Sequence, residues 1–222
     1  MIIIINHMKV IHRLPGIEIY KNTNDIYGIL SRETNDDLVG LLDLLDINKE
    51  VVSDKDVKLK ASKVRTLEQF LSSTHYVMDY NIATKFTLDL VRQILYLEEN
   101  GMTYSYLAPQ DILVIDNDVF LILNQSNIYE IDGNKIKIDK PYEVSDFMSP
   151  KIIKNKVLPL KVDFTEVYYS VGSLLVYCLF NISIKENTDL RSVLGPIYAT
   201  RLYWFIDKCL IKDPRKRKLM FF

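Results

Sequence analysis

This chain of 222 residues has few cysteines and histidines and a net charge close to zero. Each of these features argues against a class of function. The two cysteines, Cys178 and Cys209, lie in apolar stretches without a C-x-x-C pair, and none of the three histidines is near them in sequence. A zinc site is therefore unsupported, and we expect buried, reduced thiols. With 28 basic and 29 acidic residues, the composition provides no long-range attraction for nucleic acid or an anionic membrane.

Long apolar runs are also few. The opening MIIIIN contains only four consecutive isoleucines, too few for a signal-peptide core or a membrane span, and predicts an edge strand or a packing tail. The most apolar segment, residues 167–184, approaches the length of a span but is interrupted by Ser170, Gly172 and Ser173. We interpret it as a helix buried on every side, and we expect a soluble, cytoplasmic protein with no membrane partner.

The pattern of the chain changes near residue 63. Residues 17–30 predict two strands around the polar turn KNTND, residues 35–48 a helix with Asn35 as its N-cap, and residues 49–62 a β-hairpin. After Val64 the pattern becomes mainly helical. We therefore predict an α+β protein with a small, mostly β region at 1–63 and a mainly helical region at 64–222.

Several elements of the second region are specific enough to be tested. We expect a short helix opening at Thr66, a long helix ending at Gly101, a hairpin after Asp111 and an amphipathic helix in residues 197–210. The basic segment at 212–218 predicts a solvated loop, with phosphate contact as the alternative. The apolar face of the long helix would consist of Leu88, Val91, Ile94, Leu95 and Leu97.

The order of elements from about Val64 to Lys218 resembles the eukaryotic-type protein kinase family. The resemblance depends on six motifs in sequence order: TLEQFL, LVRQILYLEENGM, YSYLAPQDILV, FMSPKI, YYSVGSLLVY and LIKDPRKR. They are similar to the helix after the kinase hinge, the helix before the catalytic loop, the H-R-D-L-x-P-x-N-I-L loop, the A-P-E segment, the D-x-W-S-x-G helix and the closing D-P-x-x-R. The resemblance implies a bilobal fold with a reduced, mostly β N-terminal lobe and a mainly helical C-terminal lobe.

The catalytic-loop positions lack the groups that phosphoryl transfer needs. On this resemblance Tyr106 stands at the position of the base, and a phenol with a pKa of about 10 stays protonated at neutral pH. Tyr104 and Ser105 replace the histidine and arginine of the loop, and Ala108 replaces its lysine. We expect both tyrosines to be packing aromatics; the alternative is a dedicated role in docking a partner.

The metal positions are also altered. Asp111 stands where kinases have the metal-binding asparagine, and the position of the metal aspartate is Leu123 or Asn124. Neither of these two side chains has the carboxylate needed to hold Mg²⁺ against phosphates. Asp111 and Asn124 together would be a residual cation site, although a lone carboxylate and an amide more often cap turns. We expect no bound metal and no cofactor.

The N-terminal region departs further from the family pattern. No G-x-G-x-x-G is present, because Gly16 and Gly28 are isolated. Leu30 would stand at the lysine position of V-A-I-K, and Asp43 or Asp46 at that of its glutamate partner.

Two structural positions of the C-terminal lobe are changed as well. The A-P-E glutamate normally pairs with the D-P-x-x-R arginine, but these positions hold Lys151 and Arg217, two like charges. Glu166 would neutralise part of this charge if it lay nearby. Val167 replaces the aspartate that begins the buried helix. What remains is an apolar frame of Leu107, Ile112, Leu113, Val171, Leu174 and Trp204.

These observations predict a catalytically inactive kinase-like protein, a pseudokinase, that acts as a scaffold or allosteric regulator of an active kinase or another enzyme. The alternative is a divergent kinase or nucleotide-dependent transferase that uses Asp111, Asp116, Asp118 or Asp146. The third reading is an α+β domain with accidental spacing, which would lack the buried helix or the hairpin. The composition, rich in isoleucine, lysine and asparagine, is typical of an AT-rich genome such as that of a large DNA virus or a parasite.

Overall fold

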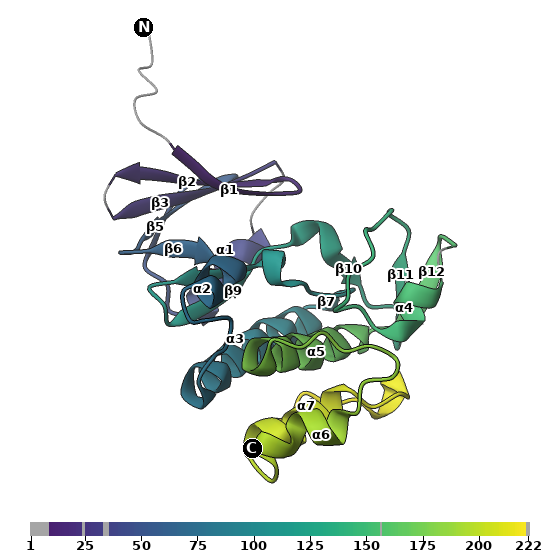
Figure 1. The fold of residues 1–222 in the computed structure, drawn as a ribbon. Coiled ribbons are helices and arrows are strands. Elements are labelled where there is room, and N and C mark those ends of the chain that lie inside the picture. The colour runs from purple at the N-terminus through teal and green to yellow at the C-terminus, as the bar shows by residue number, and fades with distance from the viewer. Residues whose placement is uncertain (1–8, 24, 33–35, 156, 221–222) are drawn as a thin grey trace, which may run out of the picture. The chain divides into compact units, whose positions relative to one another are not determined.

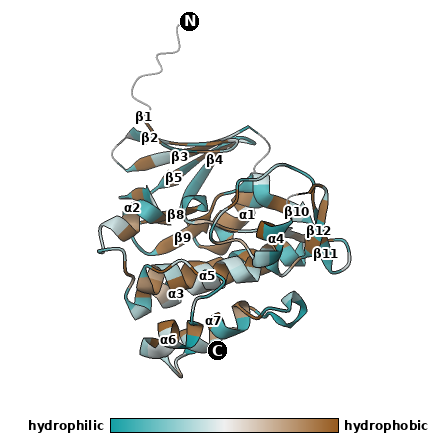
Figure 2. Cartoon of the chain, turned by 45° about the vertical axis from the view of Figure 1, so that its right-hand side comes forward, coloured by the Kyte–Doolittle hydropathy of each residue, from teal (hydrophilic) through white to brown (hydrophobic). Residues whose placement is uncertain are grey.

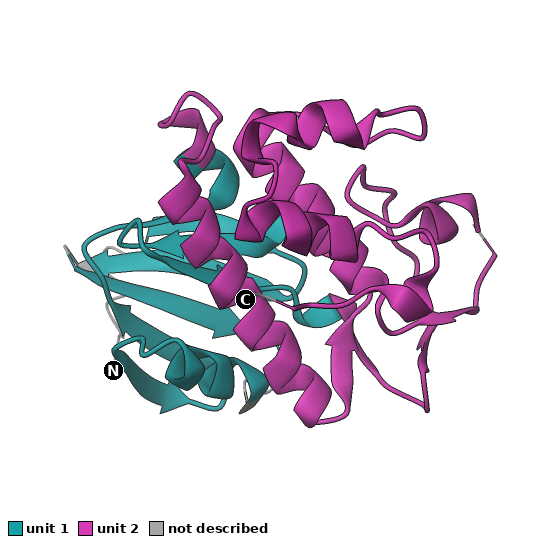
Figure 3. Ribbon diagram, turned by 90° about the horizontal axis from the view of Figure 1, so that it is seen from below, with its two compact units in different colours: residues 1–70, 110–126 teal, residues 71–109, 127–222 magenta. Residues whose placement is uncertain are grey.

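The computed structural model describes residues 9–23, 25–32, 36–155 and 157–220. The expectations for MIIIIN and for Asn35 as an N-cap lie outside these residues. The protein is a mixed α+β fold that contains a five-stranded antiparallel sheet and several helices (Figure 1), which confirms the predicted fold class at this level. The chain divides into two compact units, residues 1–70 with 110–126 and residues 71–109 with 127–222 (Figure 3). The predicted lobes, 1–63 and 64–222, stay a prediction.

Unit 1 contains the five-stranded sheet, with strand order β1-β2-β3-β5-β4. Isoleucine, valine and leucine side chains alternate along its strands, so that Ile19, Ile29 and Val57 form one fully buried row. Helix α1 buries Leu38 and Leu42. The two strands around KNTND, the following helix and the hairpin are confirmed, with bounds β1 Lys9–Leu14, β2 Ile17–Thr23, β3 Ile26–Ser31, α1 Asp36–Leu44, β4 Lys49–Ser53 and β5 Asp56–Lys60.

The other face of this sheet has a tyrosine packed onto a glycine. A Cβ atom at Gly28 would lie 2.0 Å from Cζ of Tyr20, so the ring occupies the place of a side chain. The Tyr20 hydroxyl donates a 2.8 Å hydrogen bond to Oδ1 of Asp56, and burial together with this carboxylate raises the pKa of the phenol. Gly28 is therefore required for packing, which explains an isolated glycine within a strand.

A three-stranded sheet completes unit 1, in the order β6-β8-β9 (Val64–Thr66, Ile112–Ile115 and Val119–Ile122), and its hydrophobic strands are coloured brown in Figure 2. Asp116 and Asn117, with φ of 52° and 66°, make the turn of the predicted hairpin. Oδ1 of Asp116 accepts hydrogen bonds from Ser62 and from the Lys63 amide. Although burial raises the pKa of Asp116, these bonds lower it overall.

Helix α2 (Leu67–Ser72) opens at Thr66, as predicted. The Thr66 hydroxyl accepts from the amide of Gln69, and the Gln69 side chain accepts from the amide of Thr66. This reciprocal pair is a capping box, which the sequence T-x-x-Q encodes locally.

Two long helices form the interior of unit 2. Helix α3 (Tyr80–Glu99) begins at Asp79, whose carboxylate accepts from the amides of Asn81 and Ile82, and ends with Gly101 at φ +74°, as predicted. Helix α5 (Glu166–Phe180) is buried along most of its length but ends before the predicted residue 184. Asn181 adopts a left-handed conformation, φ 53°, which stops the helix there.

The predicted apolar face of α3 is partly wrong. Leu95 is 40% exposed, whereas the polar residues Asp89 and Gln93 are buried. The Asp89 carboxylate accepts two hydrogen bonds from Lys85 one turn earlier, which allows a charge inside the unit. Periodicity did not detect this second buried stripe because its residues are polar.

The remaining elements of unit 2 are short. Two two-stranded sheets are formed by β7 with β10 and by β11 with β12, and no helix in the described part of the chain is long and apolar enough to cross a membrane. The bounds are β7 Met102–Tyr104, β10 Ile128–Glu130, β11 Lys135–Ile138, α4 Pro150–Lys154, β12 Leu160–Asp163, α6 Leu190–Leu194 and α7 Arg201–Cys209, with 3-10 turns at Pro109–Asp111, Gln125–Asn127, Gly195–Ile197 and Pro214–Lys216.

We predict that Gly28→Ala destabilises the protein by about 2–3 kcal/mol, because the new methyl group displaces the Tyr20 ring and breaks its bond to Asp56. Urea unfolding followed by far-UV circular dichroism measures the change. Gly195→Ala is the matched control, since a Cβ atom there meets nothing within 4 Å. Equal effects of the two substitutions would show that the Tyr20 ring does not need this site.

Candidate functional site

The first part of the loop that resembles a catalytic loop lies inside unit 2. Tyr104 is the last residue of β7, pairs with Ile128 of β10 and is 1% exposed. The backbone amide of the buried Ser105 donates a 2.9 Å hydrogen bond to the carbonyl of Asn127. Both side chains are enclosed by protein, so Tyr104 packs and is not available as a docking aromatic.

Tyr106 and Ala108 are also part of the packing of unit 2. The Tyr106 ring lies 6.5 Å from that of Tyr142, and both rings pack against a cluster of buried apolar residues that includes Ile136 and Val162. Ala108 is fully buried. The position that the resemblance assigns to the loop lysine lies in the interior, where a charged side chain would be costly.

Asp111 and Asn124, both in unit 1, are directly bonded to one another. The Asn124 amide nitrogen donates a 2.6 Å hydrogen bond to Oδ1 of Asp111, and both side chains are buried. The Ser126 hydroxyl donates to Oδ1 of Asn124 at 2.7 Å. Because a carboxylate only accepts hydrogen bonds, Asp111 sets the orientation of the amide, with its NH₂ group toward the carboxylate. Leu123 is also buried. It contacts Asp111 through the main chain, because its backbone amide donates a hydrogen bond to the Asp111 carbonyl. Asn124, not Leu123, therefore shares the polar environment of Asp111.

The orientation of Asn124 determines what this pair can do chemically. A cation needs oxygen ligands, but Asn124 presents its NH₂ group to the carboxylate and its oxygen to Ser126. Within the described residues, no group of three or more histidine, cysteine, aspartate or glutamate side chains is arranged to hold a metal ion.

The other candidate acids have separate structural roles. The Asp116 carboxylate joins the hairpin turn to Ser62 and Lys63, and Asp118 is exposed beside the same turn. Asp146 belongs to unit 2, where it forms a 2.5 Å ion pair with Lys185.

The positions proposed for the kinase lysine and glutamate do not form a pair. Leu30 is 43% exposed on β3, Asp43 forms an ion pair with Lys49, and Asp46 follows α1 in a left-handed conformation. Gly16 has φ +79° in the short turn between β1 and β2, a backbone conformation that favours glycine over other residues. The turn therefore explains why a single glycine is present at this position.

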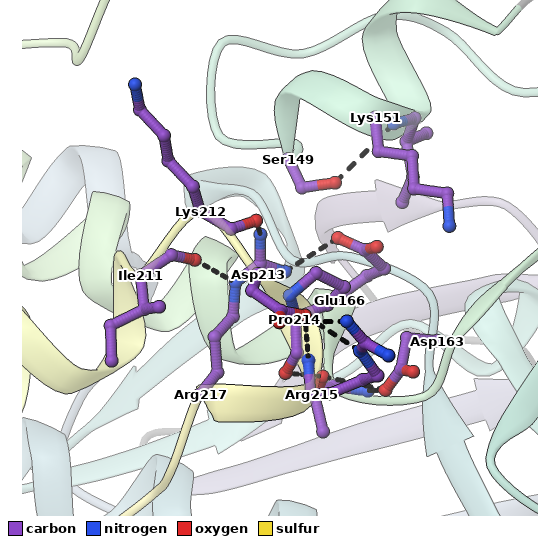
Figure 4. Close-up of polar contacts among 12 residues, drawn as sticks. Ser149, Lys151, Asp163, Glu166, Ile211, Lys212, Asp213, Pro214, Arg215 and Arg217 are labelled. Carbon is purple, nitrogen blue, oxygen red and sulfur yellow. Dashed lines mark hydrogen bonds and ion pairs between the residues drawn. The ribbon is translucent and has the colours of Figure 1, made fainter.

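A buried ion pair joins the start of α5 to the end of the chain (Figure 4). Nη1 of Arg217 donates a 2.7 Å hydrogen bond to Oε2 of Glu166, with side-chain exposures of 3% and 0%. Nε of Arg217 also donates to the carbonyl of Ile211 at 2.8 Å, and the guanidinium lies 5.3 Å from the centre of the Tyr169 ring. Lys151 is exposed, and no described residue forms an ion pair with it.

This arrangement bears out one expectation and corrects another. Glu166, which would neutralise part of the like charges at Lys151 and Arg217 if it lay nearby, does lie nearby and pairs with Arg217. Arg217 also does not belong to a solvated basic loop, although its neighbours Lys216 and Lys218 are exposed. The sequence signal was an acid at the first position of a buried helix, where a glutamate is costly unless it has a partner.

A half-buried acid, Glu98, lies where α3 packs on α5. The Tyr168 hydroxyl donates a 3.0 Å hydrogen bond to Oε2 of Glu98, while Oε1 of Glu98 is buried without a hydrogen-bond partner. Burial raises the pKa of Glu98 to about 7, and the bond from Tyr168 opposes this shift. Glu98 was not identified from the sequence, because glutamate at the end of a helix is usually exposed.

The apolar frame is confirmed except for its aromatic member. Leu107, Ile112, Leu113, Val171 and Leu174 are all 0–1% exposed, whereas Trp204 is 46% exposed. The inclusion of Trp204 in this frame is therefore wrong. Phe205, the next residue, fills the interior instead.

No protein-family model and no curated protein matches this sequence. The functional argument therefore depends on the residues and their geometry.

We predict that Glu166→Ala lowers the free energy of unfolding by about 3–5 kcal/mol, because it leaves the Arg217 guanidinium buried without its acid. Lys151→Ala should change it by no more than about 0.5 kcal/mol, since that side chain is exposed. Urea denaturation of the two variants gives both values. The double variant Glu166→Leu with Arg217→Met removes both charges, so it should recover most of the stability lost in Glu166→Ala. If it does not, the unpaired Arg217 charge is not the cause of that loss.

We further predict a pH-dependent effect at Glu98. Its pKa is raised from 4.5 to about 7, so between these values the folded state keeps a proton that the unfolded state has released. The contribution of Glu98 to stability therefore falls as pH rises from about 4.5 to about 7. Glu98→Gln should be more stable than the parent by about 1–2 kcal/mol above pH 7, and this difference should shrink as pH falls toward 4.5.

The measurement is urea unfolding at a series of pH values, with Glu99→Gln as the matched control at the exposed neighbouring position. A constant difference between Glu98→Gln and the parent across this range would contradict the assignment.

Proposed function

We propose that this chain is a catalytically inactive protein-kinase-like protein, a pseudokinase, that binds a protein partner as a scaffold or allosteric regulator. The proposal includes the finer fold, a bilobal arrangement with a reduced N-terminal lobe at 1–63 and a helical C-terminal lobe at 64–222. One observation carries it: the Asp111 carboxylate is bonded to the Asn124 amide at 2.6 Å, so the two residues in the metal positions satisfy one another.

The order and burial of the elements support the kinase-like part of the proposal. The two elements whose absence would have indicated accidental spacing are both present: helix α5 is buried, and strands β8 and β9 form a hairpin after Asp111. Helix α1 follows β3 along the chain, the order in which kinases have their lysine strand and αC helix. A buried arginine in the D-P-x-x-R motif still pairs with an acid, although the acid is Glu166.

The lack of catalytic groups supports the inactive part. Loss of a general base alone typically lowers a rate by about 10²–10⁴. Here the base position is Tyr106, a phenol, the loop lysine position is the buried Ala108, and the metal aspartate position is Asn124. Transfer through relocated acids is the alternative, but the carboxylates of Asp116 and Asp146 already have partners of their own.

The loss of these groups leaves binding as the remaining function of such a fold. We propose a protein partner, either an active kinase or another enzyme, in the cytoplasm, and neither nucleic acid nor membrane. The near-neutral net charge of −1 supports a protein partner, since it offers no general attraction to polyanions.

We predict that the purified chain transfers no label from γ-labelled ATP to itself or to a general protein acceptor, with Mg²⁺ or Mn²⁺. Mg²⁺ alone should not raise its melting temperature, because the Asn124 amide occupies the cation position. Both results follow from the missing carboxylate. The measurements are a filter-binding transfer assay and a thermal-shift titration.

Asn124→Asp is the matched variant. It places two carboxylates in contact, so the variant should be less stable than the parent in the absence of metal and should regain stability with millimolar Mg²⁺. Label transfer that Asp111→Asn abolishes would overturn the proposal. If Mg²⁺ stabilised the parent as much as it stabilises Asn124→Asp, the hydrogen bond between Asn124 and Asp111 would no longer support the proposal.

A further inference from the structure

Three aromatic side chains of unit 2 form an exposed stack at the start of α7. Tyr198 and Tyr203 pack edge to face with ring centres 5.1 Å apart, and Tyr203 and Trp204 do so at 5.0 Å. Tyr198 is 67% and Trp204 46% exposed, and Trp204 is the single tryptophan of the chain. Exposed tyrosine and tryptophan in contact with one another are typical of binding surfaces, where they serve as rigid anchors.

The stack is not needed to pack α7. The buried face of this helix consists of Leu202, Phe205, Ile206 and Cys209 and packs against α5. Successive residues of a helix are separated by about 100°, so Arg201 and Lys208 lie on the same side of Trp204, within about 60° of it. The outer face of α7 therefore presents an aromatic residue beside two cations.

A small hollow lies next to the stack, between α6 and α7, which are neighbours in Figures 1 and 2. Its volume is about 150 Å³, and Tyr203, Leu194 and Leu210 line it together with Arg191 and Asp207. Pockets for whole small-molecule ligands usually have about 300–1,000 Å³, so this hollow suits one apolar side chain of a larger partner.

The charges around the stack are mostly basic. Arg191 and Arg201 are exposed, and neither guanidinium forms an ion pair with any residue of the described ranges. Lys208 lies 3.3 Å from Asp207, the acid that lines the hollow. Asp189, the exposed N-cap of α6, also lies here, because its carboxylate accepts from the amide of Arg191. Three cations against two acids give this surface a local charge of about +1 in a chain of net charge −1, which favours an acidic partner.

The same charges disfavour a second copy of this chain. Consider two copies of α7 that pack antiparallel about a two-fold axis at Trp204. In such a contact the residues that precede Trp204 in one copy face the residues that follow Trp204 in the other. Arg201 of one copy would therefore meet Lys208 of the other copy, because both lie on the same side of Trp204. Like charges opposed in this way weaken such a contact.

We propose that this surface, defined by Tyr198, Tyr203, Trp204, Arg191, Arg201 and Lys208 and named the α7 face, docks an acidic segment of a partner protein. One apolar side chain of the segment enters the hollow beside Tyr203, Trp204 covers its backbone, and its carboxylates pair with the three cations. The inference rests on the proposed role in protein binding, but it does not depend on the kinase resemblance.

The experiment uses the whole chain and a short synthetic peptide of glutamates around a Leu-Leu pair. Because Trp204 is the single tryptophan, its emission reports on the α7 face directly. We expect a saturable blue shift, with an affinity that decreases as salt is raised. A glutamate peptide without leucine and a lysine peptide with leucine should each bind at least about tenfold more weakly.

Two variants locate the contact, measured by the anisotropy of the labelled peptide. Arg201→Glu should weaken binding about five- to tenfold, and Trp204→Ala about thirtyfold, as expected for a rim charge and a central aromatic anchor. Arg92→Glu is the matched control, because Arg92 is exposed on α3 and the substitution changes the charge equally. It should leave the affinity unchanged.

Several outcomes would overturn the proposal: no binding of the acidic peptide, equal losses in Arg201→Glu and Arg92→Glu, or tighter binding of poly(U) RNA than of the peptide. Concentration-dependent dimerisation abolished by Trp204→Ala would assign the α7 face to a second copy instead. These results leave the absence of phosphoryl transfer untouched. Transfer activity, conversely, would overturn the pseudokinase proposal and leave the α7 face standing.

Discussion

The buried ion pair between Glu166 and Arg217 is the constraint on which the structure of unit 2 depends. Removing two charges from water costs several kcal/mol per ion, so each partner is tolerated only while the other is present. The remaining guanidinium donors bond to backbone carbonyls of the segment that follows α7. The pair thus fixes this segment to the first turn of α5, and α7 itself packs on α5. The acid is Glu166, the neutralising residue that the sequence suggested, and position 151 holds a lysine.

The pair of Asp111 and Asn124 follows the same principle in unit 1. A buried carboxylate must be neutralised, protonated or hydrogen-bonded, and here an amide and a hydroxyl form a chain that satisfies it. If Asp111 and Asn124 correspond to the asparagine and aspartate of a kinase metal site, their side-chain types are exchanged. One carboxylate and one amide are still present, but the NH₂ group of Asn124 now donates to the carboxylate of Asp111.

Local signals predicted much of the fold, and tertiary contacts decided what they missed. The strands around KNTND, the capping box at Thr66 and Gln69, and the helix end at Gly101 depend on neighbouring residues, which a sequence contains. The burial of Asp89 depends on Lys85, and the place of Glu166 on a residue 51 positions away. Periodicity identifies apolar faces but not polar stripes or distant partners. The sequence could thus pair Asp111 with Asn124 as a candidate cation site, but it could not show that the Asn124 amide donates to the Asp111 carboxylate.

The exposure of Trp204 follows from how tightly the other side of α7 is packed. A Cβ atom at Gly172 of α5 would lie 2.8 Å from Cβ of Cys209, so the two helices are in close contact and no space remains there for an indole ring. Phe205, Leu202 and Ile206 already fill this interface. A large aromatic residue on the outer face adds nothing to that core, while it costs solubility. Folding alone therefore does not account for Trp204 on this face, which is the reason for proposing a binding role for it.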